Sequence, residues 1–219
     1  MNKFSIRKIK NKLYGNEEYT CLIDDVSIQE WLDGIAKDSD DKQLKEWGDL
    51  LGLAFAFTDD LNWKSDTRFI SELFNMDSAI IPILVCEDDL DLNCIVIVIE
   101  VEKKDGRVFW KRIGYVNHQF EDFEKEKASG ILCTEAYTKE DWEKYGDNIA
   151  LEKVDSPAWL KWVNENTYEE LFRRCMNYTL PYYKTEGNVI WLKDLNWIFD
   201  KLEYEKTIDE YRKRIVVND

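Results

Sequence analysis

Residues 92–116 read LNCIVIVIEVEKKDGRVFWKRIGYV and predict a β-hairpin. In the middle of the first arm, residues 92–102, consecutive residues are apolar, so apolar side chains lie on both faces of the strand. This is typical of a strand inside a sheet. Asp105 and Gly106 follow, and an Asp-Gly pair tolerates the positive φ angles of a two-residue type I′ turn. Residues 108–116 then form the returning arm. We therefore expect this hairpin to be central in an antiparallel sheet.

The tight turn also fixes which residues of the two arms face each other. It places Glu100 opposite Lys111 and Val101 opposite Trp110. Opposite charges, and apolar side chains, that face each other across two strands contribute roughly 0.2–1 kcal/mol per pair. Both expected pairs therefore favour the hairpin.

Other short segments predict further strands around the hairpin. Residues 80–85 are apolar, and Pro82 within them indicates an edge position or a bulge, because proline cannot donate a ladder hydrogen bond. Residues 4–8 alternate between apolar and polar side chains, and residues 19–23 and 188–192 also have strand character. These segments supply partners for the hairpin in a mainly antiparallel sheet.

Helix starts are indicated by capping residues. Ser27 and Glu30 form a capping box, in which the hydroxyl and the carboxylate satisfy free N–H groups of the first turn. Residues 66–74 place their apolar side chains on one helical face. Further helices are expected to begin at four positions in the C-terminal third, namely Ser156, Thr167, Asp194 and Thr207.

Together these patterns predict an α+β fold with a mainly antiparallel β-sheet, packed helices and a helical C-terminal third. The 219 residues are 44% apolar and include 14% aromatic residues, which is enough material for one large packed core. We expect a single domain over residues 1–219. It can be subdivided into a sheet-containing core, residues 1–118, and a mainly helical part, residues 130–219.

The sequence carries a formal net charge of −15 at pH 7, and most of this charge lies in one segment. Residues 24–91 contain 18 acidic and five basic residues, which gives −13. A dense negative field repels phosphate groups and anionic headgroups, so we expect no direct binding to nucleic acid or membranes. The same field attracts a basic protein partner, or else serves solubility alone.

Sequence patterns of catalysis and cofactor binding are missing from this chain. His118 is its only histidine, and it has neither a GxSxG nucleophile motif nor a glycine-rich phosphate loop. None of the cysteines has CxxC spacing. We expect them to be buried free thiols in a reducing cytosol: Cys21, Cys86, Cys94, Cys133 and Cys175. The sequence therefore predicts no catalytic residue, no cofactor and no metal site.

One carboxylate cluster partly matches the ligand spacing of an EF-hand calcium loop. Asp89, Asp91, Asn93 and Glu100 occupy positions 1, 3, 5 and 12 of such a loop. Position 6 should be the glycine that makes the sharp turn, but it is Cys94, and the residues after it favour a strand. We therefore interpret the segment as an acidic loop and not as a calcium site.

Residues 87–91 form this acidic loop at the end of the predicted sheet. Its neighbouring carboxylates repel one another unless a cation or a basic partner compensates them. Nine tryptophans provide material either for the core or for anchoring contacts at an interface. The residues that we expect to bind a partner are Asp59, Asp60, Asp88, Asp89 and Asp91, with Trp47 and Trp63 as anchors.

Several stretches resemble immunity proteins of bacterial polymorphic-toxin and contact-dependent growth inhibition systems. They are residues 19–24 with the helix start at 27–32, and residues 85–94 leading to 108–114; the similarity covers about residues 4–116. The resemblance implies a cytoplasmic bacterial protein that binds a cognate toxin domain and blocks its active or substrate-binding surface. Such toxins are often basic nucleases, which would suit an acidic partner.

Two other classes of function remain open at this point. A hydrolase that uses carboxylates, with or without a divalent metal, is one alternative. A decoy that mimics nucleic-acid charge, of the anti-restriction type, is the other, and it should bind many DNA-handling proteins. An immunity protein should bind a single toxin and should not be an enzyme.

Overall fold

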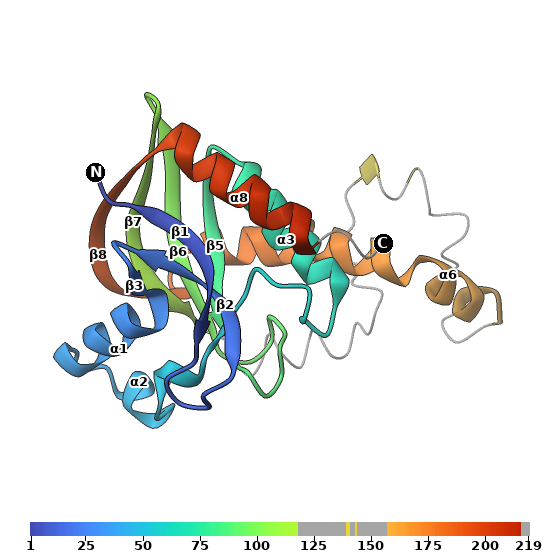
Figure 1. Ribbon diagram of the computed structural model, residues 1–219. Helices are drawn as coiled ribbons and strands as arrows, with labels where there is room; N and C mark the ends of the chain where they lie inside the picture. Colours follow the sequence, from blue (N-terminus) through green and yellow to red (C-terminus); the bar gives the residue numbers. More distant parts are fainter. Residues whose placement is uncertain (118–138, 141–142, 144–156, 216–219) are drawn as a thin grey trace.

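The computed structural model describes residues 1–117, 139–140, 143 and 157–215. Within these ranges the chain forms two antiparallel sheets with helices packed around them (Figure 1). The predicted α+β fold is confirmed. Some residues discussed above lie outside the described ranges: His118, Cys133 and Ser156.

The larger sheet has five strands in the order β4-β5-β6-β7-β8, and all neighbouring strands are antiparallel. Its strands are β4 (Ala54–Phe55), β5 (Ser78–Val85), β6 (Val96–Lys104), β7 (Arg107–Val116) and β8 (Val189–Asp200). The predicted hairpin is β6 with β7, and β6 is the middle strand. Its central position is therefore confirmed, although β6 begins four residues later than residue 92.

The hairpin turn has the predicted conformation. Asp105 and Gly106 have φ angles of 52° and 73°, as a two-residue turn of the primed type requires. Val101 pairs with Trp110, as expected. Pro82 coincides with a register shift in β5, which agrees with the bulge predicted there.

A bulge in the hairpin changes the other predicted pair. The register shifts between Glu100 and Val101, so Arg112 and not Lys111 faces Glu100. The guanidinium of Arg112 binds the Glu100 carboxylate and lies 4.0 Å from the ring centre of Trp191 on β8. The predicted register of Glu100 and Lys111 was therefore wrong by one residue, because the extra residue of a bulge cannot be seen in a regular strand pattern. The two side chains still form an ion pair, with the Lys111 Nζ 3.8 Å from the Glu100 carboxylate.

The smaller sheet has three strands in the order β1-β2-β3: β1 (Phe4–Lys10), β2 (Glu17–Ile23) and β3 (Val26–Ser27). It lies over one face of the larger sheet (Figure 1). Its N-terminal end is tied to β8, because Asn2 and Ile198 exchange two hydrogen bonds, of 2.7 and 3.0 Å. The two sheets therefore share one core.

Helix α1 (Ile28–Asp38) begins at the predicted capping box. The Ser27 hydroxyl accepts a hydrogen bond from the Glu30 N–H and donates one to the Glu30 carboxylate. Trp31, on the inner side of α1, packs edge-on against Trp197 of β8 with ring centres 5.1 Å apart. The helix is thus fixed to the larger sheet.

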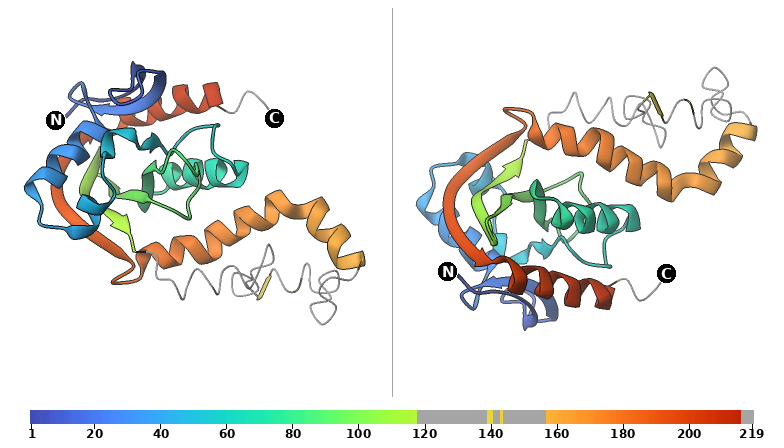
Figure 2. Two further views of the ribbon diagram at one scale, coloured as in Figure 1. Left: turned by 90° about the horizontal axis from the view of Figure 1, so that it is seen from below. Right: turned by 90° about the horizontal axis from the view of Figure 1, so that it is seen from above.

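The remaining helices follow in chain order: α2 (Lys42–Glu46), the 3₁₀ turn η1 (Leu50–Gly52), α3 (Lys64–Asn75), α6 (Pro157–Arg174), the π-helical turn η4 (Cys175–Thr179), α7 (Leu180–Lys184) and α8 (Lys201–Ile215). Figure 2 shows α3 between α8 and α6. The Arg212 side chain donates hydrogen bonds from α8 to Ser71 and Asn75 of α3. None of the helices in the described ranges has the length and apolar character needed to cross a bilayer.

The C-terminal third is less helical than predicted. A strand was expected at residues 188–192, but strand β8 continues to Asp200. The predicted helix start at Asp194 is wrong: Asp194 lies within β8 and pairs with Arg112. The edge of β7 pairs with β8 from Arg107 to Val116, with two register shifts, and this pairing overrides the local helical pattern. Trp197 and Phe199 are buried two residues apart, as in a strand.

Two other predicted helix starts lie inside longer helices. Helix α6 runs through Thr167 without interruption. Helix α8 begins at Lys201, ahead of Thr207, and the Asp200 carboxylate accepts a hydrogen bond from the Glu203 N–H at 3.1 Å. Asp200 therefore acts as the N-cap, and the pattern at Thr207 has no capping role.

The centre of the core joins both sheets and α8 through aromatic side chains. Phe4 of β1 packs against Trp110 of β7 and Tyr204 of α8, with ring centres 5.5 and 4.5 Å apart. The buried Trp110 Nε1–H donates a hydrogen bond to the Tyr204 hydroxyl at 3.1 Å. This bond satisfies a donor that would otherwise be buried without a partner.

The close approach of β7 and β8 predicts opposite effects for two glycine substitutions. A Cβ at Gly114 of β7 would lie 2.3 Å from the backbone oxygen of Ile190. Gly114→Ala should therefore destabilise the chain by about 1–3 kcal/mol, because the backbone must shift. Gly34 lies exposed in α1 with no atom within 4 Å of such a Cβ. Gly34→Ala should stabilise it by about 0.5–1 kcal/mol.

Urea unfolding of the two variants and the parent chain measures both effects. Equal midpoints for Gly114→Ala and the parent would contradict the described pairing of β7 with β8. The Gly34 variant controls for the general effect of adding a methyl group.

Candidate functional site

Two loops meet at the end of the larger sheet where β5 ends and β6 begins. One is residues 58–63, which precede α3, and the other is residues 86–95, which connect β5 to β6. The Asn62 N–H donates to the Leu90 carbonyl at 2.9 Å, and the Asn62 side chain donates to the Asp89 carbonyl. We call these two segments the acidic loop pair.

The longer loop of the pair is shaped by its own backbone. Cys86 N–H donates to the Ile95 carbonyl at 3.1 Å and closes the loop at its base. Leu90 N–H donates to the Cys86 carbonyl at 2.9 Å, and Leu90 has a positive φ of 45°. Leu92 is buried in the core. The loop is therefore held by hydrogen bonds and by an apolar anchor.

The predicted acidic residues all lie on the acidic loop pair. The side chains of Asp59 and Asp60 are exposed on one loop, and those of Asp88 and Asp89 are exposed on the other. Asp91 is half-buried, and its carboxylate accepts a hydrogen bond from the Asn93 N–H at 2.8 Å. The structure thus brings together two stretches that lie about 30 residues apart in the sequence.

The two predicted tryptophan anchors have different surroundings. Trp63 directly follows Asn62 on the acidic loop pair and is 46% exposed. Trp47 is half-buried after α2 and packs edge-on against Tyr115 of β7, with ring centres 4.9 Å apart. Trp63 is therefore available for contacts, whereas one side of Trp47 is occupied by the protein itself.

A third segment beside the acidic loop pair was not predicted. Asn11 accepts hydrogen bonds from the N–H groups of Leu13 and Tyr14, which shapes the turn between β1 and β2. Partial desolvation, together with the negative charges of Glu87 and Asp88, raises the pKa of Tyr14, whose side chain is 58% exposed. Asn11 at the start of the turn was a sequence signal for the turn itself. No residue near it in the sequence indicated that Tyr14 lies beside the longer loop.

Glu87 is a partly desolvated carboxylate of the longer loop. Desolvation, and then the nearby charge of Asp88, raises the pKa of Glu87. One of its carboxylate oxygens, Oε2, is buried and has no hydrogen-bond partner among the described residues. Its ionised form is therefore disfavoured in the folded chain.

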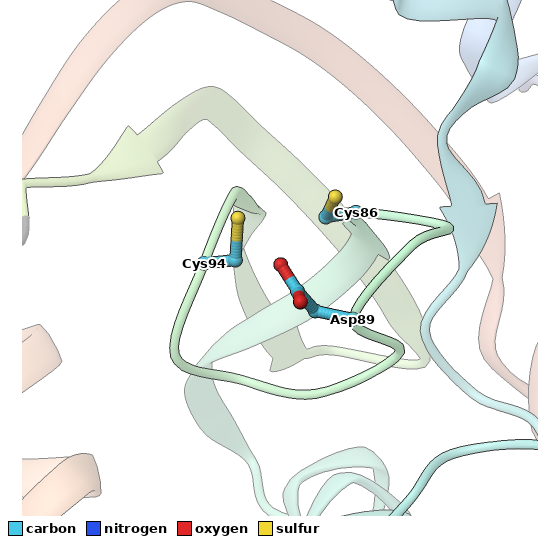
Figure 3. A group of neighbouring side chains, drawn as sticks. All are labelled: Cys86, Asp89 and Cys94. Atoms are coloured by element: carbon cyan, nitrogen blue, oxygen red, sulfur yellow. The ribbon is translucent and has the colours of Figure 1, made fainter.

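Three side chains of the same loop could hold a metal ion. Cys86, Asp89 and Cys94 each offer a ligand atom, and these atoms all lie within 4.8 Å of one another (Figure 3). Partial desolvation, followed by the hydrogen bond with Asp89, raises the pKa of Cys94 to about 12. Without a metal this thiol is therefore protonated at neutral pH.

The exposure of two cysteines differs from the expectation that they are buried thiols. Cys21 and Cys175 are buried, as predicted, but Cys86 is half-buried and Cys94 is exposed. The three residues that could hold a metal ion follow a Cys-x₂-Asp-x₄-Cys pattern, which differs from zinc motifs made of histidine and cysteine at close spacing. The calcium alternative gains no support, because Glu100 binds Arg112 within the sheet.

The desolvated carboxylate of Glu87 generates a pH-dependent prediction. Because its folded pKa is raised, ionisation of Glu87 opposes folding as the pH rises through that pKa. Glu87→Gln should therefore be more stable than the parent at pH 7. The difference should vanish below the unfolded pKa of glutamate, about 4.3, where both states are protonated.

Urea midpoints measured between pH 4 and pH 8 test this expectation. Glu186→Gln, at an exposed position before β8, is the matched control and should follow the parent at every pH. A Glu87→Gln curve that also follows the parent would contradict the proposed desolvation.

No family model, curated protein or solved structure matches this chain.

Proposed function

We propose that this chain is an immunity protein that binds and neutralises a cognate bacterial toxin domain, a basic one such as a nuclease. The observation that carries the proposal is the acidic loop pair, which gathers carboxylates from two separate stretches beside exposed aromatic side chains. Its mode of action would be to cover the active or substrate-binding surface of the toxin. It acts in the cytoplasm and needs no catalysis of its own.

The carboxylates predicted to bind the partner are not compensated by basic side chains in the part of the chain that the structure describes. Among the described residues, no Lys or Arg forms an ion pair with its predicted carboxylates, namely Asp59, Asp60, Asp88, Asp89 and Asp91. By contrast, Asp25 lies 3.2 and 3.1 Å from the side-chain nitrogens of Lys3 and Arg7. Unpaired carboxylates on one surface steer a basic partner toward it.

Aromatic side chains at the edge of this surface supply contacts that charge alone cannot. Trp63 lies on the shorter loop, and Tyr14 lies close to Glu87 and Asp88. Exposed Trp and Tyr are typical anchors of protein interfaces, because they bury a large area with few rotatable bonds. The acidic loop pair therefore combines charge for encounter with apolar area for affinity.

Co-expression with the product of the neighbouring gene tests the function directly. We expect this chain to bind that product and to protect the cell that produces it. A chain that neither binds nor protects would rule out the proposal. Binding to many DNA-handling proteins would favour the charge-mimicking decoy instead, and substrate turnover by the chain alone would favour the hydrolase.

The position of the interface generates a kinetic prediction. The triple variant Asp59→Asn, Asp60→Asn, Asp88→Asn removes charge from both loops and leaves Asp89 in place. Its association rate with the toxin should fall about tenfold at low salt, because steering contributes 10–10³-fold to such rates. The effect should shrink as salt rises, because screening acts over about 8–10 Å at 0.1–0.15 M ionic strength.

A second triple variant controls for the overall loss of charge. Asp105→Asn, Glu203→Gln and Glu210→Gln remove as many charges from exposed positions at the opposite end of the hairpin and on α8. Stopped-flow association at several salt concentrations compares both variants with the parent. Equal rates and equal salt slopes for the two triple variants would place the encounter surface elsewhere.

A further inference from the structure

The base of the longer acidic loop holds two sulfur atoms and a carboxylate at one point. Val85 pairs with Val96 in the sheet, and the next residues, Cys86 and Ile95, are joined by a backbone hydrogen bond of 3.1 Å. Cys94 therefore comes back beside Cys86 as a direct result of strand pairing. The register of two neighbouring strands fixes both thiols.

The carboxylate is positioned by the other hydrogen bonds of the loop. The turn closed by Leu90 N–H and the Cys86 carbonyl returns Asp89 toward Cys86. Asn62, from the neighbouring loop, holds the Asp89 carbonyl from outside. Figure 3 shows the Asp89 carboxylate pointing into the space between the sulfurs of Cys86 and Cys94.

We propose that Cys86, Asp89 and Cys94 form a binding site for a thiophilic divalent cation, with Zn²⁺ as its metal. The ligand atoms lie within 4.8 Å of one another, so small side-chain rotations bring them onto one ion. Two thiolates select zinc over calcium and magnesium, which prefer oxygen ligands. A carboxylate is a regular third ligand of zinc.

The surroundings of the group also favour a cation. Glu87, Asp88 and Asp91 lie on the same longer loop, and their negative charges add to that of Asp89. No ion pair among the described residues compensates Asp88 or Asp91, so their negative field attracts a cation to the loop. Three protein ligands leave a fourth position for water or for a side chain of a partner.

This site is independent of the proposed function, and the test uses the full chain alone. The reduced protein is treated with a chelator, transferred to metal-free buffer and titrated with Zn²⁺ against a zinc indicator. We expect tight binding of one equivalent per chain and a rise in the thermal unfolding midpoint, because the ion binds the folded state. Co²⁺ should give the visible absorption of thiolate coordination.

Variants of the ligands locate the ion. Cys94→Ser and Asp89→Asn should each weaken Zn²⁺ binding by at least about 100-fold, since even loss of an outer-shell partner costs 10–100-fold. Asp88→Asn is the matched control: it removes a neighbouring exposed carboxylate and should leave the zinc affinity within a factor of about 3, as expected for loss of a screened charge. Circular dichroism confirms that each variant is folded.

Several results would overturn the site. Failure to bind Zn²⁺ is the first, and an unchanged affinity in Cys94→Ser is the second. Stabilisation by Ca²⁺ as large as that by Zn²⁺ is the third, because it would mean that oxygen ligands suffice and the thiols have no role.

Discussion

Strand β6 is hydrogen-bonded along both of its edges, to β5 and to β7, and this double pairing positions most of the molecule. Residues 96–99 of β6 are fully buried, so both faces of the sheet need cover. The smaller sheet lies over one face, and α3 and α7 pack against β5. The pairing with β7 places Trp110 in the core, and the pairing with β5 fixes the base of the acidic loop. The fold and the candidate site thus depend on the same backbone ladder.

Elements whose conformation is set by adjacent residues could be predicted from the sequence. Elements whose conformation depends on contacts with residues far away in the sequence could not. The Asp105-Gly106 turn and the Ser27 cap are set by the backbone preferences of a few adjacent residues. Strand β8 is different, because residues 194–199 fit a helical face almost as well as a strand. Only the exposed edge of β7, more than 70 residues earlier, decides between them. The bulge at Lys111 also depends on tertiary contacts, among them the stacking of Arg112 on Trp191.

Some features of the candidate site could likewise be predicted from the sequence, and others depend on the fold. The density of acidic residues along the chain was sufficient to single out the residues around Asp59 and Asp88. Charged loops at the end of a sheet are exposed whatever their tertiary contacts. Two other contacts join residues far apart in the sequence, namely Trp47 with Tyr115 and Tyr14 with Glu87. No local sequence pattern indicates either of them. The metal-binding group was visible only as two cysteines eight residues apart, a spacing that gains meaning once β5 and β6 are paired.

The proposed cation and the proposed basic partner would bind the same loop, so their affinities must be coupled, and equally in both directions. Two thiols become thiolates and release their protons when they bind Zn²⁺, so the two positive charges of the ion are offset and the net charge of the loop changes little. Even one unit charge pair about 10 Å apart in water is worth only about 0.4 kcal/mol, and salt reduces it further. Ordering of the loop by the ion would favour the partner. That gain is small, because Asn62, Leu90 and the buried Leu92 already hold the loop without a metal. Both contributions to the coupling are therefore small, and the ion stabilises the loop with little effect on the encounter.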